Sequence, residues 1–448
     1  MIYHIARNTW GISQKHFKLI YKGAIEPALL YAAQIWGESA NLVHLKRKLL
    51  SVQRTFAIRS CRAYRTAPTD ALLAIANITP IHIKINSVIR TYNLMKVNKD
   101  HQTKGSEFAP TDSDSQAEED HKITQLIKRH GIDNYINNTV DQHHPAERNN
   151  IHISREDGSL GPNYNWIIYT DGACNEKGTG AAVVIYNGDN TVAHEKYYKL
   201  ASFCNSNQAE LWAMERALFL LVKNIKNLKG SINICTDSRN AIRCINGKKK
   251  NTSLGVNIQH LARHISKKRK LIFSWIPGHS GSQGNSRADK LAANNNQLSI
   301  SFDKIPINHI HKYIKDNTIK EWQREWTQSS TGRTTYQFIP SITNRQTMSY
   351  LTPTYSMTQL LTGHGNLPSY LHKIKKKSSD NCSCDDMTKC DIEHILLYCP
   401  LHNAAREELI NLCTQDSKTW PLPWDYFLST KKTYKQLENF VSQCGLFS

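Results

Sequence analysis

Four acidic residues of this chain lie where they could hold a divalent metal ion. Asp171 ends the stretch "NWIIYTD", Glu210 lies early in "NSNQAELWAMERALFLLVKNI", Asp237 follows the apolar run of "SINICTDS", and Asp289 lies in "NSRADKLAANN". Any one of them alone is most simply a turn or capping residue. Several carboxylates within a few ångströms, however, repel one another unless cations neutralise them. Mg²⁺ prefers oxygen ligands, and two such ions can hydrolyse a phosphodiester.

The elements around these acids predict an α/β domain over residues 161–298. Short β-branched and aromatic runs at 165–171, 180–186 and 191–200 predict a meander of three strands. Residues 205–225 begin with cap-forming Asn and Ser and continue with an apolar stripe, which predicts a long helix. Two further strands, each followed by one helix, complete five strands.

Each acid is expected at the end of one of these elements. Asp171 would end the first strand, and Asp237 would end a parallel neighbour of that strand. Glu210 would lie in the first turn of the long helix, and Asp289 would open the last helix. Adjacent parallel strands with a helix packed over them would bring these carboxylates together.

Four stretches resemble the signature blocks of a type 1 ribonuclease H, in the version carried by insect-type non-LTR retrotransposons. They are "YTDGA", "SNQAELWA", "CTDSRNAI" and "WIPGHSGSQGNSRADKLA". The resemblance implies a ribonuclease H-like mixed five-stranded sheet with flanking helices. It also implies that Asp171, Glu210, Asp237 and Asp289 are the catalytic ligands of two Mg²⁺ or Mn²⁺ ions.

The same resemblance makes His279 a mobile histidine that assists proton transfer or product release. His279 lies in a loop between Gly278 and Gly281, and an unperturbed pKa of about 6.5 suits this task. The chain departs from the family pattern at Ser286, where retroelement members usually carry an acid. Some members also insert a basic helix before the fourth acid, and we expect "GKKKN" and "SKKRK" to supply positive charge instead.

The stretch "CSCDDMTKCDIEHILLYCP" offers Cys382, Cys384, His394 and Cys399 as ligands of a tetrahedral zinc site. It is similar to the terminal Cys-Cys-His-Cys motif of the same retrotransposons, so we expect a small zinc knuckle at 382–399. Cys390 could replace one of these ligands. The alternative is a group of reduced thiols that binds no metal.

The flanking regions are predicted from pattern and composition. Residues 1–100 are expected to be helical, and "YKGAIEPALLYAAQIWG" resembles the region just after the palm of non-LTR reverse transcriptases, which implies a partial thumb-like region. Residues 101–160 are expected to be an acidic and polar linker, since 105–121 hold six acidic residues and no Lys or Arg. Residues 299–448 would form a C-terminal region with the knuckle. The chain would then be the C-terminal portion of a longer polyprotein.

The composition favours a polyanionic partner. The chain has 57 Lys and Arg against 37 Asp and Glu, a net charge of +20, which indicates nucleic acid first and an anionic membrane surface second. No secretory signal is recognisable, so the 11 cysteines are expected to be reduced or metal-bound. We expect an intracellular protein, in the nucleus rather than the cytoplasm, with no membrane association and no small-molecule cofactor.

Taken together, the motifs favour a metal-dependent endonuclease that hydrolyses the RNA strand of RNA–DNA hybrids. The alternative is a catalytically inactive retrotransposon remnant that still binds nucleic acid. A nuclease of the same fold acting on structured DNA is a third reading, which the flanking motifs disfavour.

Overall fold

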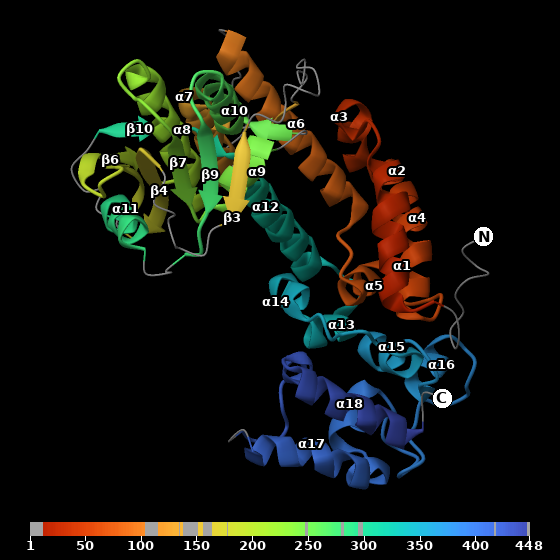
Figure 1. Ribbon diagram of the computed structural model, residues 1–448. Coiled ribbons are helices and arrows are strands. Elements are labelled where there is room, and N and C mark those ends of the chain that lie inside the picture. The colour runs from red at the N-terminus through yellow and green to blue at the C-terminus, as the bar shows by residue number, and fades with distance from the viewer. Residues whose placement is uncertain are drawn as a thin grey trace. The chain divides into compact units, whose positions relative to one another are not determined.

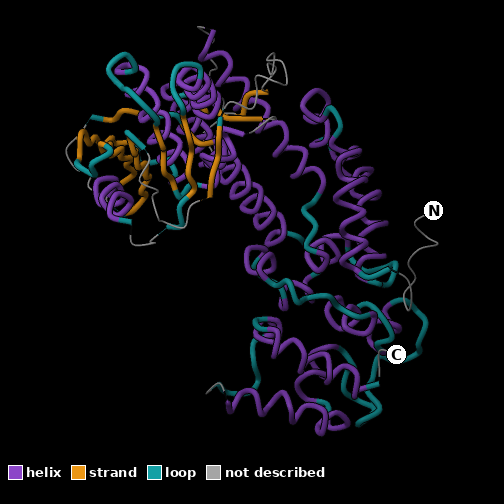
Figure 2. Tube along the Cα trace, viewed as in Figure 1, coloured by secondary structure: helices purple, strands orange, loops and turns teal. Residues whose placement is uncertain are grey.

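The computed structural model describes residues 12–103, 115–133, 135–137, 151–155, 164–176, 178–246, 250–278, 282–293, 299–415 and 418–445. The chain divides into two compact units. Unit 1 comprises Met1–Asn93 and Tyr313–Ser448, and unit 2 comprises Leu94–Lys312. All strands among the described residues belong to unit 2, whereas unit 1 is helical (Figure 2).

Unit 2 contains a seven-stranded sheet in the order β10-β6-β5-β4-β7-β9-β3 (Figure 1). β5 is antiparallel to both of its neighbours, and every other pair is parallel, so the sheet is mixed as predicted. The predicted number of five strands is wrong, because the short strands β3 and β10 extend the two edges. The strands are β3 (His152–Arg155), β4 (Trp166–Asn175), β5 (Gly178–Asn187), β6 (Val192–Leu200), β7 (Ile232–Thr236), β9 (Leu271–Trp275) and β10 (Ile300–Phe302).

The two faces of this sheet bury different residues of β4. Ile168 belongs to the core that includes α8 (Ser206–Asn224), α9 (Arg239–Asn246) and α10 (Ser253–Ser266). Ile167 and Tyr169 belong to a second core that includes Ala288 of α11 (Gln283–Ala293). This division follows from the alternation of side chains along a strand. The single helix predicted between the fourth and fifth strands is two helices, α9 and α10.

Residues 101–160 differ from the predicted linker wherever they are described. They contain α7 (Ser115–His130), on which Ile123 and Ile127 are buried one turn apart. They also contain β1 (Ile132–Asp133), paired with β11 (Ile305–Pro306), and β2 (Tyr135–Asn137), paired with β8 (Lys250–Thr252). The acidic composition of 105–121 indicates a linker, although the residues that follow it have the apolar spacing of a helix.

Unit 1 joins two segments that are distant in the sequence. Phe56 and Leu73 share one core with Leu396, Cys399 and Leu437, so residues 12–93 and 313–445 fold together. The N-terminal region is helical as predicted, but it is not separate from the C-terminal region. The helices of unit 1 are α1 (Gln14–Ile20), η2 (Tyr21–Ile25), α2 (Glu26–Leu30), α3 (Ala33–Trp36), η3 (Gly37–Asn41), α4 (Val43–Cys61), α5 (Thr69–Ala76), most of α6 (Ile81–Thr103), most of α12 (Ile307–Gln328), α13 (Arg333–Phe338), α14 (Ile342–Thr347), α15 (Tyr355–Thr362), α16 (Pro368–Lys373), η5 (His394–Tyr398), η6 (Pro400–His402), α17 (Asn403–Gln415), η7 (Trp424–Leu428) and α18 (Lys431–Cys444).

In the described part of the chain, no single helix has both the length and the apolar character needed to cross a membrane. α5 and the first part of α6 pass that test only as a pair, bent by 63°.

Candidate active site

Parallel pairing places two of the predicted acids side by side. β4 and β7 are paired as far as Tyr169 and Cys235, and Asp171 and Asp237 each lie two residues further along. Asp237 directly follows β7, as predicted. Asp171 does not end its strand, because β4 continues to Asn175 and Asp171 pairs with Ala182 of β5. Asp171 is therefore held within the sheet and is only 6% exposed.

The N-terminus of α8 brings Glu210 to the same place. A capping box fixes this helix start: Asn205 Oδ1 accepts from Gln208 N at 2.9 Å, and Gln208 Oε1 accepts from Asn205 N at 3.3 Å. Glu210 lies just beyond the first turn, not within it as predicted. A Cβ atom on Gly172 would lie 2.3 Å from the backbone nitrogen of Glu210, so glycine permits the close approach of helix and strand.

Asp289 reaches the site from the opposite side of the sheet. It lies in the middle of α11, not at its start as predicted. A Cβ atom on Gly284 would lie 2.1 Å from the Tyr169 ring, so glycine is needed for α11 to pack on β4. Asp289 and the other three acids line one cavity of about 200 Å³ together with Gly172, Ser282, Asn285 and Ser286.

The negative charges of the acids that line this cavity repel one another. Oxygen atoms of Asp171, Glu210 and Asp237 all lie within 4.8 Å of one another. Burial, and then the charges of Asp237 and Asp289, raise the pKa of Asp171 to about 7. Burial, and then the charges of Asp171 and Asp237, raise the pKa of Glu210 to about 9. Such carboxylates ionise readily only when a cation shares the cavity.

The donor set of the cavity fits a hard divalent ion. All three converging ligand atoms are carboxylate oxygens, the ligand type that Mg²⁺ and Mn²⁺ prefer. Glu210 Oε2 is buried and has no hydrogen-bond partner in the described structure. An unpartnered buried carboxylate oxygen is costly unless a ligand satisfies it. Asp171, Glu210 and Asp237 could therefore hold an ion, and Asp289 could contribute to a second position on the Asp171 side.

Not every predicted residue can be placed in this site. His279 lies outside the described residues, as do Lys248 and Lys249 of the predicted basic cluster. In the cluster at 267–270, Arg269 donates to the carbonyl oxygens of Leu228 and Ile225, so it closes the end of α8. That guanidinium is occupied within the domain and is poorly placed to bind phosphate.

The sequence interpretation missed a buried acid behind the site. Asp133 of β1 is 3% exposed, and its carboxylate accepts from Gln208 Nε2 at 3.1 Å and from Ser253 Oγ at 3.1 Å. Gln208 Nε2 also donates to the carbonyl oxygen of Lys304 at 3.1 Å. Asp133 thus ties together the first turns of α8 and α10. No local signal marks it, because it lies in a segment interpreted as linker.

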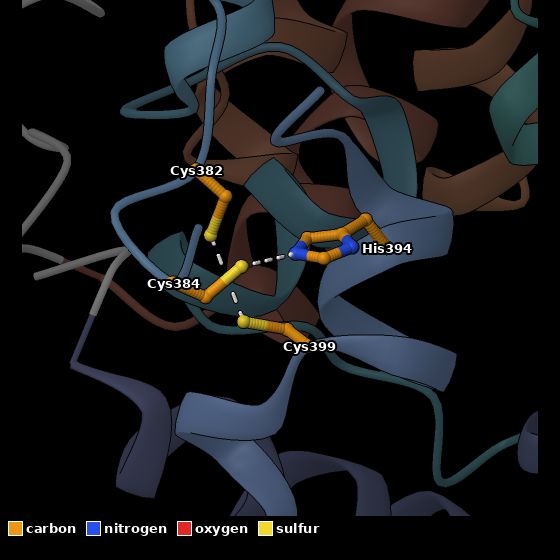
Figure 3. Close-up of side chains that lie close together, drawn as sticks. All are labelled: Cys382, Cys384, His394 and Cys399. Atoms are coloured by element: carbon orange, nitrogen blue, oxygen red, sulfur yellow. Dashed lines mark hydrogen bonds between the residues drawn. The ribbon is translucent and has the colours of Figure 1, made fainter. Parts of the chain in front are cut away.

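The four predicted zinc ligands form a second cluster, in unit 1. Cys382, Cys384, His394 and Cys399 each offer one atom within 4.8 Å of the others (Figure 3). Cys382 Sγ lies 3.6 Å from Cys399 Sγ, and Cys384 Sγ lies 3.3 Å from His394 Nε2. Sulfur atoms at about 2.3 Å from a tetrahedral ion would be about 3.8 Å apart, so the group is close to the size of a zinc site. Cys390 is buried nearby but is not among the four.

Comparisons with known proteins agree with this geometry. The family model described as RNase H matches residues 163–297, which include all four acids. A ribonuclease H of Francisella philomiragia subsp. philomiragia is 32% identical over 143 residues, covering 29% of this chain and 88% of that protein. The chain belongs to the ribonuclease H family.

The relatives of this ribonuclease H also include polyproteins of type-1 retrotransposable elements. The Pol polyprotein of element R1 2 of Nasonia vitripennis is 26% identical over 137 residues, covering 30% of this chain and 32% of the relative. The chain therefore matches only about a third of the length of that polyprotein. Among solved structures, LC11-RNase H1 in complex with RNA/DNA hybrid is 29% identical, covers 29% of this chain and 95% of its own, and has a TM-score of 0.25.

Proposed function

We propose that this chain is a metal-dependent endonuclease that hydrolyses the RNA strand of RNA–DNA hybrids. The observation that carries the proposal is the convergence of Asp171, Glu210 and Asp237 within 4.8 Å, with one buried glutamate oxygen left unpartnered. Membership of the ribonuclease H family supports the reaction class, and the net charge of +20 supports a nucleic-acid substrate.

Each acid has a position that suits its proposed role. Two divalent ions, when bound, supply an activated water and stabilise the leaving oxygen of the phosphodiester. Asp171 lies within 4.8 Å of Glu210 and Asp237 and also interacts with the charge of Asp289, which suits a ligand shared by both ions. The sheet holds Asp171 and Asp237, and the capped helix holds Glu210, so the carboxylates are preorganised. His279 would assist proton transfer or product release.

The partner is proposed to be recognised mainly through its backbone. Hybrid selectivity would come from 2′-hydroxyl groups on one strand and deoxyribose geometry on the other, so sequence preference should be weak. The thumb-like helices of unit 1 would hold nucleic acid beside a structural zinc site formed by Cys382, Cys384, His394 and Cys399. The distances of 3.6 Å between Cys382 Sγ and Cys399 Sγ and of 3.3 Å between Cys384 Sγ and His394 Nε2 support zinc.

The test is cleavage of three matched substrates by the full chain and by Asp171→Asn. We expect the unaltered chain to cut the hybrid, but not duplex DNA or duplex RNA, in Mg²⁺ or Mn²⁺. Asp171→Asn should lower the rate at least a thousandfold, about 4 kcal/mol of transition-state stabilisation, while hybrid binding persists. Asp189→Asn is the matched control, because Asp189 is an exposed turn residue bonded to Thr191.

The outcomes of this test distinguish the proposed hybrid nuclease from the two alternative functions. Hybrid binding without cleavage by the unaltered chain would favour the inactive remnant. Cleavage of structured DNA in preference to hybrid would favour a nuclease of the same fold that acts on structured DNA. Metal-dependent hybrid cleavage that survives Asp171→Asn would refute the assignment of the acids.

A further inference from the structure

Unit 1 contains a cavity that none of the four clustered zinc-ligand candidates lines, although Lys389, Asp391 and Glu393 also line the neighbouring cavity at Cys384 and His394. Its volume is about 520 Å³, within the range of about 300–1,000 Å³ that is usual for small-molecule sites. Its walls come from α13, from the α15–α16 segment, from the loop that carries the cysteine cluster, and from Trp424. Ser369 N donates to the carbonyl oxygen of Cys390 at 3.2 Å, which joins two of these walls.

Four residues with ring side chains line the cavity: His364, Tyr370, His372 and Trp424. His364 lies 4.5 Å from Tyr370, centroid to centroid, and Thr66 Oγ1 contacts both His364 Nδ1 and the Tyr370 hydroxyl. Trp424 lies 4.8 Å from the Phe338 ring, which supports it from within the core. Burial, and then the charges of Lys373 and Arg54, lower the pKa of His364 to about 4. The imidazole is therefore neutral near pH 7 and presents an uncharged ring.

Charged groups of both signs line the remaining walls. Asp380, Asp391 and Glu393 supply carboxylates, and Lys389 Nζ lies 3.4 Å from Asp391 Oδ2. Lys373 lines the cavity, and the exposed run 375–377 adds three more lysines after it. Three carboxylates in the wall disfavour a free inorganic anion, and the scarcity of aliphatic side chains disfavours an apolar ligand. The lining suits a flat ligand with hydrogen-bond donors on its edge and an attached anionic group.

We propose that this cavity binds an unpaired nucleotide of a single-stranded nucleic acid, with the base against the rings and the phosphate toward Lys373. Bases stack on aromatic side chains, and carboxylates accept from the amino and imino groups of a base edge. A paired base cannot enter in this way, because its edge is already bonded to the opposite strand. The site would select single-stranded segments, unlike the cavity proposed to act on hybrids.

The test measures binding of the four nucleoside 5′-monophosphates and of a single-stranded RNA oligonucleotide to the full chain. We expect at least one monophosphate to bind with a Kd of about 1 mM or lower, and base-paired RNA of the same sequence to compete poorly. His364→Ala should weaken binding about tenfold. Glu393→Gln should weaken binding at least fivefold or change the preference among the four bases, and Lys373→Ala should weaken all four.

Two exposed residues outside the cavity provide matched controls. Glu407→Gln and Lys431→Ala make the same chemical changes on α17 and α18, and neither should alter binding by more than about twofold. The proposal is overturned if no monophosphate binds at about 10 mM, or if Glu393→Gln and Lys373→Ala both leave binding unchanged. It is also overturned if inorganic phosphate binds as tightly as every monophosphate, since the base would then contribute nothing. None of these readouts depends on hybrid cleavage, so the proposed function and this site can fail separately.

Discussion

Asp171→Asn should stabilise unit 2 when divalent ions are absent, although it should abolish cleavage. The substitution removes a charge that burial and two neighbouring aspartates make unfavourable. The pKa of Asp171 rises from 3.8 to about 7. At neutral pH this rise of about three units corresponds to roughly 4 kcal/mol of folding free energy, as an upper limit. The buried amide must find new partners, so we expect a net gain of about 1–3 kcal/mol.

The sign of the pH dependence provides a second check. A carboxyl whose pKa is raised on folding contributes its stability below the unfolded value and loses it as the pH rises through the folded value. The advantage of Asp171→Asn should therefore be small near pH 4, grow up to about pH 7 and then level off. Mg²⁺ should reduce the difference in stability between Asp171→Asn and the unaltered chain, because only the aspartate carboxylate is stabilised by binding the ion.

Hydrogen exchange in peptides from β4 and β7 is the appropriate assay, because the chain has two units and a single melting curve would mix them. With a chelator present, exchange in Asp171→Asn should be about 5 to 150 times slower than in the unaltered chain. Asp189→Asn should give no such protection, since hydrogen bonds from Thr191 hold the pKa of Asp189 below its usual range. Faster exchange in Asp171→Asn at pH 8, or an equal difference at pH 4, would refute the reasoning.

Four further predictions concern the same features. Gly172→Ala should lower hybrid cleavage at least a hundredfold, because its Cβ would displace the start of α8, whereas Gly23→Ala, with no atom within 4 Å of the added carbon, should not. Mg²⁺ affinity measured by calorimetry should rise from pH 6 to pH 9 with release of protons, because the pKa values of Asp171 and Glu210 lie at about 7 and about 9; a flat profile would count against these acids as ligands. Chelation of zinc should speed hydrogen exchange in α4 and α5 as well as in the knuckle, because Cys399 shares the core of Phe56 and Leu73; exchange in β4 should stay unchanged. Hybrid affinity should fall at least tenfold between about 50 and 200 mM salt, and a salt-independent affinity would contradict the electrostatic binding.

The acidic residues of the site were predictable from the sequence because each lies in or beside a recognisable strand or helix pattern. Asp171 and Asp237 follow apolar strand patterns, and Glu210 follows helix-capping residues, so their convergence follows from parallel pairing of the two strands and from packing of the helix over them. Their positions within elements were less predictable. β4 continues past Asp171 because β5 still pairs with it, and Asp289 lies within α11 because that helix begins at Gln283.

The features that were missed depend on contacts between distant segments. Nothing near Phe56 indicates that it packs in one core with Leu437, because such packing depends on tertiary structure. The edge strand β3 has only four residues and pairs with β9, far along the chain, so alternation within it is too brief to recognise. The linker prediction for residues 101–160 was wrong because their short strands pair with distant segments. An acidic composition indicates exposure to solvent, but it does not indicate which strand a segment pairs with.

The buried carboxylate of Asp133 has a consequence for where this domain can be divided. Both acceptors of the Gln208 side-chain amide, Asp133 and the Lys304 carbonyl, lie outside residues 163–297. An excised fragment limited to those residues would keep all four acids, yet it would leave the amide beside Glu210 with neither acceptor. We therefore expect a fragment that begins before Asp133 and ends after Lys304, and so keeps both acceptors, to be more stable than a fragment limited to residues 163–297.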